Sequence, residues 1–251
     1  MKAILHDVSR CRGCMSCVEA CAEADGRGSD SPFAKYVREP LSADRLTTVE
    51  ETKDGRFLRR HCLHCLEPAC ATACLVGALH KTADGPVVYD ADKCIGCRYC
   101  MLACPVHAIK YEWDTPLPFV RKCQLCYDRP GGPACVQACP HDATMFGERE
   151  ELLRVARERI RARPEHYIGK VWGEREMGGT CVLFISDVSL DEWWPASLGD
   201  RSIPDLTVPL AHKTPWLALG VAGFLTGASW IIGRRNRLAG EKAEGGSDRG
   251  A

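Results

Sequence analysis

The stretch CIGCRYCMLACP, residues 94–105, decides how this sequence of 251 residues folds. Its four cysteines follow the spacing C-x2-C-x2-C-x3-C, and Pro105 comes directly after the last of them. Three thiolates this close together on a tight loop can reach three irons of one cubane cluster, whereas the fourth, one helical turn further on, points away. The stretch therefore predicts a [4Fe-4S] site that is completed by a ligand from elsewhere.

Three further cysteine groups have related spacings. Sixteen of the 17 cysteines fall into four groups of four, and Cys181 stands alone. The first group has Ala22 in place of the proline, and the second and fourth lengthen the middle gap but keep the final x3-C. The groups are Cys11, Cys14, Cys17 and Cys21; Cys62, Cys65, Cys70 and Cys74; Cys94, Cys97, Cys100 and Cys104; and Cys123, Cys126, Cys135 and Cys139. Since the fourth cysteine of such a run ligates the neighbouring cluster in two-cluster ferredoxins, we expect four [4Fe-4S] clusters in two cross-ligated pairs.

Cysteine-rich sequences also bind zinc or form disulfides, and these are the two alternatives to iron-sulfur clusters. Zinc takes four thiolates, but x2-C-x3-C endings repeated four times are not the usual spacing of zinc sites. A disulfide scaffold of this density would have many competing connectivities. No group has Trp, Asp or Ser in place of a cysteine, which favours electron transfer over substrate chemistry. We expect no catalytic residue in this chain, and a structural zinc protein is the alternative.

The overall charge and the N-terminus exclude some functions. The 33 basic and 33 acidic residues cancel, so no charge imbalance indicates nucleic acid as a partner. The N-terminus, MKAILHDVSRC, has no apolar segment and no twin arginine. We therefore expect no export signal on the chain itself.

The order of the groups predicts an inner and an outer module. Groups two and three are bridged by LVGALHKTADGPVVYDADK, residues 75–93, which is typical of a short helix, a strand, an Asp-Gly turn and a strand. Groups one and four flank this unit, so their pairing would enclose it. We expect an inner module over 60–114 and an outer module over 1–59 and 115–148.

The segment 149–213 is expected to add a helix and a strand. Leu152, Leu153, Ala156 and Ile160 recur at helical spacing before Pro164, and 180–188 have the pattern of a buried strand in which Cys181 is a core residue. Basic and polar residues near the motifs, which would raise cluster potentials if buried, are Arg12, His64, Arg98, Lys122 and His141. Solvated surface charge is an equal alternative, so no role is assigned to them, and His61 and His64 are expected to be structural rather than ligands.

A long apolar run follows the cysteine-rich part. Thr214 to Gly233 are 20 consecutive uncharged residues between Lys213 and Arg234. At ~1.5 Å of rise per residue they would span about 30 Å, the thickness of a bilayer's hydrocarbon core. Trp216 and Trp230 lie near the two ends, where interfacial indoles are expected. The run predicts a single transmembrane helix over 214–233, and a buried helix of a soluble domain is the alternative.

The flanks of this run predict its orientation. Because GRRNR follows it, the positive-inside rule puts the tail, 234–251, in the cytoplasm and the cluster domain on the periplasmic or outer face of the cytoplasmic membrane. Gly220, Gly223 and Gly227 share one face of the helix. Such a face allows close packing of a second membrane helix, which would belong to a partner subunit.

Four cysteine groups in this order, followed by an apolar run, resemble the four-cluster iron-sulfur subunits of membrane-bound, quinone-linked oxidoreductases. The stretches FLRRHCLHCLEPAC, KCIGCRYCMLACP, RKCQLC and VWGEREMGGTCVLFISDV look most similar to the electron-transfer subunits of hydrogenase-2-type [NiFe] hydrogenases. The beta subunits of formate dehydrogenase N are close relatives. The resemblance implies an α+β fold of two interleaved bacterial-ferredoxin-like modules with a C-terminal transmembrane helix.

The resemblance also implies ligand sets and partners. We name the four expected sets in order: site A, Cys11, Cys14, Cys17 and Cys139; site B, Cys123, Cys126, Cys135 and Cys21; site C, Cys62, Cys65, Cys70 and Cys104; and site D, Cys94, Cys97, Cys100 and Cys74. The implied partners are a catalytic subunit, either a [NiFe] hydrogenase or a molybdopterin enzyme, and an integral membrane quinone-reactive subunit. This sequence departs from the family in lacking a twin-arginine signal and the prolines after groups one and two.

Overall fold

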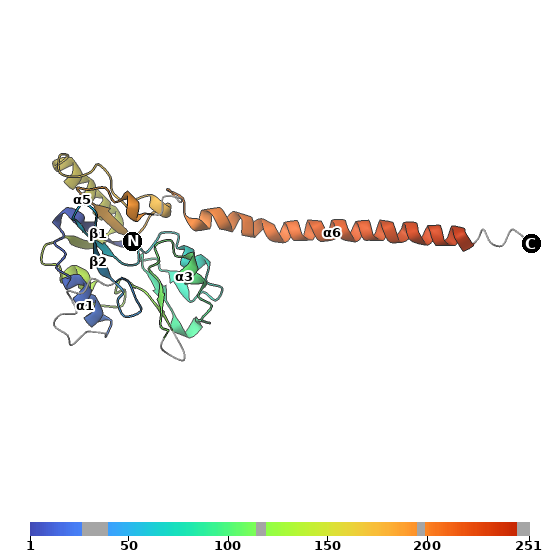
Figure 1. Ribbon diagram of the computed structural model, residues 1–251, viewed down its shortest axis with the longest axis horizontal. Helices are drawn as coiled ribbons and strands as arrows, with labels where there is room; N and C mark the ends of the chain where they lie inside the picture. The colour runs from blue at the N-terminus through green and yellow to red at the C-terminus, as the bar shows by residue number, and fades with distance from the viewer. Residues whose placement is uncertain (27–39, 114–118, 195–198, 245–251) are drawn as a thin grey trace, which may run out of the picture. The chain divides into compact units, whose positions relative to one another are not determined.

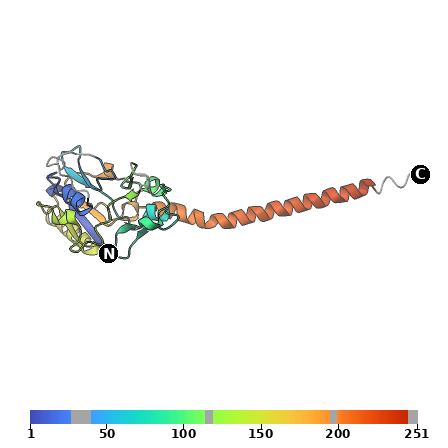
Figure 2. The ribbon, with the colours of Figure 1, turned by 90° about the horizontal axis from the view of Figure 1, so that it is seen from below.

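The computed structural model describes residues 1–26, 40–113, 119–194 and 199–244, and it divides the chain into two units (Figures 1 and 2). The first unit is Met1–Pro204 and the second is Asp205–Ala251. Residues 27–39 and 114–118 of the expected modules, and 245–251 of the expected tail, lie outside the described residues. The first unit has the mixed helix and strand content expected of a ferredoxin-like α+β fold.

Each cysteine group is associated with one short helix, and these helices pack in pairs. They are α1, Ser16–Ala24; α2, Ala69–Thr72; α3, Tyr99–Ala103; and α4, Ala134–Gln137. Helix α1 packs against α4, and α2 packs against α3. Group one thus lies next to group four and group two next to group three, and the bounds of the two modules stay a prediction.

Three antiparallel hairpins connect these helices. They are β2, Thr48–Glu51, with β3, Phe57–Arg60; β4, Leu79–Lys81, with β5, Val87–Tyr89; and β6, Lys110–Tyr111, with β7, Val120–Arg121. The strand–turn–strand prediction for 75–93 is confirmed by β4 and β5. The short helix expected at the start of this stretch is wrong, because the chain turns there instead, with a positive φ of 65° at Gly77.

A three-stranded sheet holds the first unit together. Its central strand is β1, Lys2–Asp7, which pairs antiparallel with β8, Thr144–Glu148, and parallel with β9, Val182–Ile185. Helix α5, Arg149–Ala162, packs on the sheet through Leu152, Leu153 and Ala156 (Figure 1). The predicted amphipathic helix is confirmed, as are the buried strand near 180–188 and the burial of Cys181.

The described part of the second unit lies in one helix, α6, Ile203–Glu244 (Figures 1 and 2). It contains the predicted apolar run but begins earlier and ends later, and it includes Pro209 and Pro215. The segment Ile203–Leu238 contains an apolar window with a mean hydropathy of 1.5, and by length and composition it could cross a membrane. A Cβ added at Gly220, Gly223 or Gly227 would meet no atom within 4 Å, so the glycine face is open.

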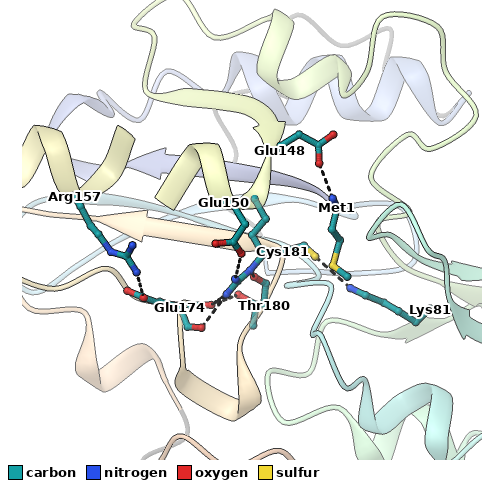
Figure 3. A network of polar contacts seen from close by, with 10 residues as sticks. Met1, Lys81, Glu148, Glu150, Arg157, Glu174, Thr180 and Cys181 are labelled. Carbon is teal, nitrogen blue, oxygen red and sulfur yellow. Dashed lines mark hydrogen bonds and ion pairs between the residues drawn. The ribbon is translucent and has the colours of Figure 1, made fainter. Parts of the chain in front are cut away.

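Arg149 ties the start of α5 to the loop before β9. Its side chain is buried, its Nε donates to the Thr180 carbonyl at 2.9 Å, and its Nη2 donates to the Glu174 carbonyl at 2.9 Å (Figure 3). The guanidinium also pairs with Glu150 at 3.3 Å. Among the described residues, Arg149 is the side chain that donates to the carbonyls of Glu174 and Thr180. It therefore connects the sheet and α5 to the loop before β9.

We expect Arg149→Met to lower the free energy of unfolding by about 3 kcal/mol, since charged hydrogen bonds to two carbonyls are lost. The measurement is the urea concentration at which half of the circular dichroism signal disappears. Arg154→Met is the matched control, because Arg154 lies on the exposed face of the same helix and pairs with Glu158 at 2.6 Å. Equal midpoints for the two variants would contradict the role given to Arg149.

Candidate metal centres

The four cysteine groups share one backbone feature. In every group the residue before the second cysteine has a positive φ: 66° at Gly13, 50° at His64, 71° at Gly96 and 60° at Leu125. This left-handed conformation is easy for glycine but strained for the other residues. His64 is held in it because it is buried and its Nδ1 accepts a hydrogen bond from the Val87 backbone nitrogen at 2.9 Å. The shared left-handed turn winds each loop tightly enough for neighbouring cysteines to face one side.

The thiols of site A line one cavity. Cys11, Cys14 and Cys17 of group one border it together with Cys139 of group four. Burial raises the pKa of Cys11, and the neighbouring thiol of Cys139 raises it further. Residues separated by most of the cysteine-rich part are therefore close together in the fold.

The thiols of site B are also neighbours. Burial raises the pKa of Cys21, and the thiols of Cys123, Cys135 and Cys126 raise it further. Cys21 is the last cysteine of group one, and the other three belong to group four. The thiols that an exchange of last cysteines between groups one and four would combine are thus neighbours in both sets.

The thiols of the expected sites C and D are neighbours in the same way. Burial raises the pKa of Cys65, and the thiols of Cys62, Cys104 and Cys70 raise it further, which brings the four cysteines of site C together. Burial raises the pKa of Cys100 to about 11, with contributions from Cys94, Cys74 and Cys97 of site D. The neighbours of these thiols follow the sets that the family resemblance implies, and the ligand sets stay a prediction.

The donor atoms fit an iron-sulfur cluster better than a single metal ion. All 17 cysteines are free thiols. Among the described residues no three Cys, His, Asp or Glu side chains are close enough together to hold one ion. Structural zinc needs four ligands at about 2.3 Å, whereas a cubane spreads its four thiolates around a larger body. The described residues thus contain no ready site for a single ion, and four thiolates per set are the ligands that a [4Fe-4S] cluster takes.

Some thiols of different sets are close enough to affect one another's pKa. Cys135 of site B raises the pKa of Cys17 of site A, after the larger effect of burial. Burial raises the pKa of Cys123 of site B to about 12, and the next contribution comes from Cys62 of site C. Burial likewise raises the pKa of Cys70 of site C to about 12, with Cys100 of site D among its neighbours. These contacts connect A to B, B to C and C to D.

The polar residues near the motifs divide into buried and exposed ones. Arg12, Arg98 and His141 are exposed, and the Arg98 guanidinium lies over the ring of Trp113 at 4.4 Å. Lys122 is buried, and its Nζ donates to the carbonyls of Cys123, at 2.7 Å, and Val87. Only the buried residues can act on a cluster without screening by solvent.

The buried histidines are uncharged side chains, and their structural role stays a prediction. Burial lowers the pKa of His61 and His64 well below the ordinary value. The Nε2 of His61 lies 3.1 Å from the Nε2 of His6 in a hydrogen-bonded pair. Sequence reasoning missed Arg59, which is buried beside these histidines and borders the cavity of site A. No spacing rule marks it, because it lies in a strand outside the cysteine groups.

Comparisons with known proteins identify the kind of cofactor. The sequence model of the 4Fe-4S dicluster domain family matches residues 53–149. A protein of Nitratidesulfovibrio vulgaris is 36% identical over 95% of this chain and 69% of its own length. The hydrogenase-2 operon protein HybA of Escherichia coli O157:H7 is 30% identical over 98% of this chain and 87% of its own length. The formate dehydrogenase iron-sulfur subunit of Haemophilus influenzae is 35% identical over 73% of this chain and 64% of its own length.

We expect Cys21→Ala to disturb site B and Cys139→Ala to disturb site A, although each cysteine belongs by sequence to the other group. The variants should each lose or alter one distinct electron paramagnetic resonance (EPR) signal of the reduced protein. Cys181→Ala is the control, since its thiol lies in the core and its loss should leave four clusters. If Cys21→Ala and Cys139→Ala altered the same signal, the exchanged ligand sets would be wrong.

Proposed function

The chain belongs to the ferredoxin-type iron-sulfur subunits of oxidoreductase complexes, and we propose that it carries electrons from a catalytic subunit at site A to a quinone-reactive membrane subunit at site D. A [4Fe-4S] cluster supplies one-electron chemistry at each site. Oxidation of one hydrogen molecule or one formate releases two electrons. They would pass singly along A, B, C and D and, with two protons, reduce one quinone.

The observation that carries this proposal is the exposure of the thiols at the two ends of the line. Among the 17 cysteines, the two exposed ones are Cys14 in site A and Cys97 in site D. The cysteines of sites B and C are buried or half-buried. A partner can therefore approach closely at A and at D, while the middle of the path is shielded from solvent.

The surfaces around the two ends differ in chemistry. The residues beside the cysteines of site D include four exposed large side chains, which we call the D rim: Leu75 at 74%, Ile95 at 63%, Tyr99 at 53% and Leu102 at 83% exposure. The exposed residues beside the cysteines of site A are polar or small: Arg10, Arg12, Glu19, Pro140, His141 and Asp142. Exposed apolar groups that gather around one site mark an interaction surface. The D rim thus favours a lasting apolar interface, and site A favours a more polar partner.

The start of α6 supports placing the membrane partner at the D end. Ser202 precedes α6, and its Oγ donates to Glu67 at 2.6 Å. Glu67 lies between Cys65 and Cys70 of site C. The residues 203–213, as helix, cover about 16 Å before the apolar run begins. The covalent connection to α6 therefore starts beside site C, which supports a membrane partner at the end of the path that holds sites C and D.

The test follows electrons in the intact, detergent-purified complex. We expect hydrogen to reduce all four clusters and added quinone to reoxidise them, as read by EPR and visible absorbance. Formate is the parallel donor, because the similarity to a formate dehydrogenase iron-sulfur subunit supports a molybdenum partner as the second candidate. Nickel or molybdenum in the same preparation identifies the partner. Clusters that neither donor reduces, or that quinone does not reoxidise, would contradict the proposal.

Variants separate the two half-reactions of this test. The double variant Leu75→Ser, Leu102→Ser removes apolar area from the D rim, where each leucine buried by a partner contributes about 2 kcal/mol to binding. We therefore expect reoxidation by quinone to be at least about tenfold slower. Reduction by the donor should be unchanged. Gly223→Leu fills the open glycine face of α6 and should act on the same half-reaction by loosening the membrane partner. Glu19→Ser, beside site A, is the matched control and should leave reoxidation unchanged.

We also propose that the cluster domain lies on the periplasmic or outer face and the C-terminus in the cytoplasm. Arg234, Arg235 and Arg237 support this orientation, because basic residues stay on the cytoplasmic side. Protease added to spheroplasts should then digest the cluster domain. Replacing the three arginines with glutamine should weaken the orientation and give a mixed population. Digestion only in inverted membrane vesicles would contradict the assignment.

A further inference from the structure

Arg59 is a buried cation whose donors are mostly unused. It lies in β3, only 4% of its surface is exposed, and its Nε donates to the Thr47 hydroxyl at 2.9 Å. Its Nη1 and Nη2 are both buried and have no hydrogen-bond partner among the described residues. Burying a charge without a partner is strongly unfavourable. The fold therefore retains at this position a guanidinium that requires an anion.

The groups around Arg59 are thiols of two different sites. Burial lowers the pKa of Arg59, but the thiols of Cys135, Cys17, Cys21 and Cys123 outweigh it and raise the pKa above its ordinary value. Cys17 belongs to site A, and the other three belong to site B. Arg59 also borders the cavity formed by the thiols of site A. The guanidinium thus lies between the two sites of the outer module.

The neighbouring histidines do not share this charge. Burial lowers the pKa of His6 and His61 well below the ordinary value, and the charge of Arg59 lowers both further. Lys122, the other buried cation near site B, donates to the carbonyls of Val87 and Cys123. Arg59 is therefore the charged group between sites A and B that still has free N–H donors.

The strand fixes Arg59 in this position. Arg59 is paired with Val49 in the β2–β3 hairpin, and both Leu58 and Arg59 are buried, so both faces of β3 are covered. Phe57 packs under the first cysteine loop, since a Cβ at Gly13 would come within 2.7 Å of its ring. The hairpin thus lies against group one on the side where the guanidinium enters.

We propose that Arg59 is the common counter-charge and N–H donor of the clusters at sites A and B and raises both of their reduction potentials. A fixed positive charge favours the reduced state, which carries one more negative charge, and N–H groups directed at cluster sulfur act in the same sense. Sites C and D lie further along the line and should feel the charge less. The proposal rests on the four cluster sites and not on the identity of either partner.

The test is an EPR-monitored redox titration of the full-length protein. In Arg59→Met we expect the reduction equilibrium of sites A and B to shift at least tenfold towards the oxidised state, about 59 mV for one electron. Sites C and D should shift by less than a third of that amount, and Arg59→Lys should shift A and B less than Arg59→Met does. Arg60→Met is the matched control, because Arg60 is the next residue of the strand but is half-buried and pairs with Glu50 at 3.5 Å. The reduction potentials of all four clusters in Arg60→Met should equal those of the wild type.

If Arg59→Met does not bind clusters, a second measurement on the wild type tests the inference. Wild-type protein labelled with ¹⁵N-arginine should show ¹⁵N hyperfine coupling to the reduced clusters of sites A and B, and Arg59→Lys should lack it. Absence of this coupling in the wild type overturns the inference. Unchanged potentials in a fully loaded Arg59→Met overturn it as well. Iron analysis of the wild type separates these outcomes from failure of the four-cluster assignment, which would appear as a lower iron content.

Discussion

The predicted four-cluster arrangement depends on placing the last cysteine of one group beside the first three cysteines of another. For the outer module this closure spans most of the cysteine-rich part, from Cys11 to Cys139. Strand β1 ends four residues before Cys11, and β8 begins five residues after Cys139, so their antiparallel pairing fixes both groups in one place. The pairing of these strands thus brings the cysteines of sites A and B close together, and α5 stabilises the sheet by packing on it.

The same closure creates a buried polar interior between the two outer sites. Arg59, His6 and His61 lie there together, and the histidines are uncharged because they are buried and adjacent to a cation. An interior of this kind is unstable without anions, so the folding of the outer module and the loading of its sites are linked. Lys122, the other buried cation near site B, differs from Arg59 because it is already paired with backbone carbonyls.

Local patterns in the sequence predicted the local elements and little else. The cysteine spacing, the β4–β5 hairpin, helix α5 and the buried Cys181 each have a signal within a few residues. The strand β1 has none, because KAILHD is short and its partners β8 and β9 lie far along the chain. Arg59 was missed for a related reason. A strand with one covered face alternates buried and exposed residues, and only the tertiary fold covers the second face of β3, where the arginine lies.

The surfaces around sites A and D differ in chemistry, and this difference fits two different kinds of interface. Site A is bordered by charged and small groups, which a partner can contact while water remains in the interface. Site D is bordered by large apolar side chains, which are costly to leave in water and so favour a partner that stays bound. The chain leaves for α6 beside site C, where Ser202 is fixed by Glu67 and packs so closely on Gly178 that a Cβ there would lie 2.9 Å from it. The chain segment that leads to α6 and the apolar side chains of site D thus belong to the same predicted inner module. Under the proposed function, the anchor and the membrane partner would both act on this module, and the outer module would bind the catalytic subunit.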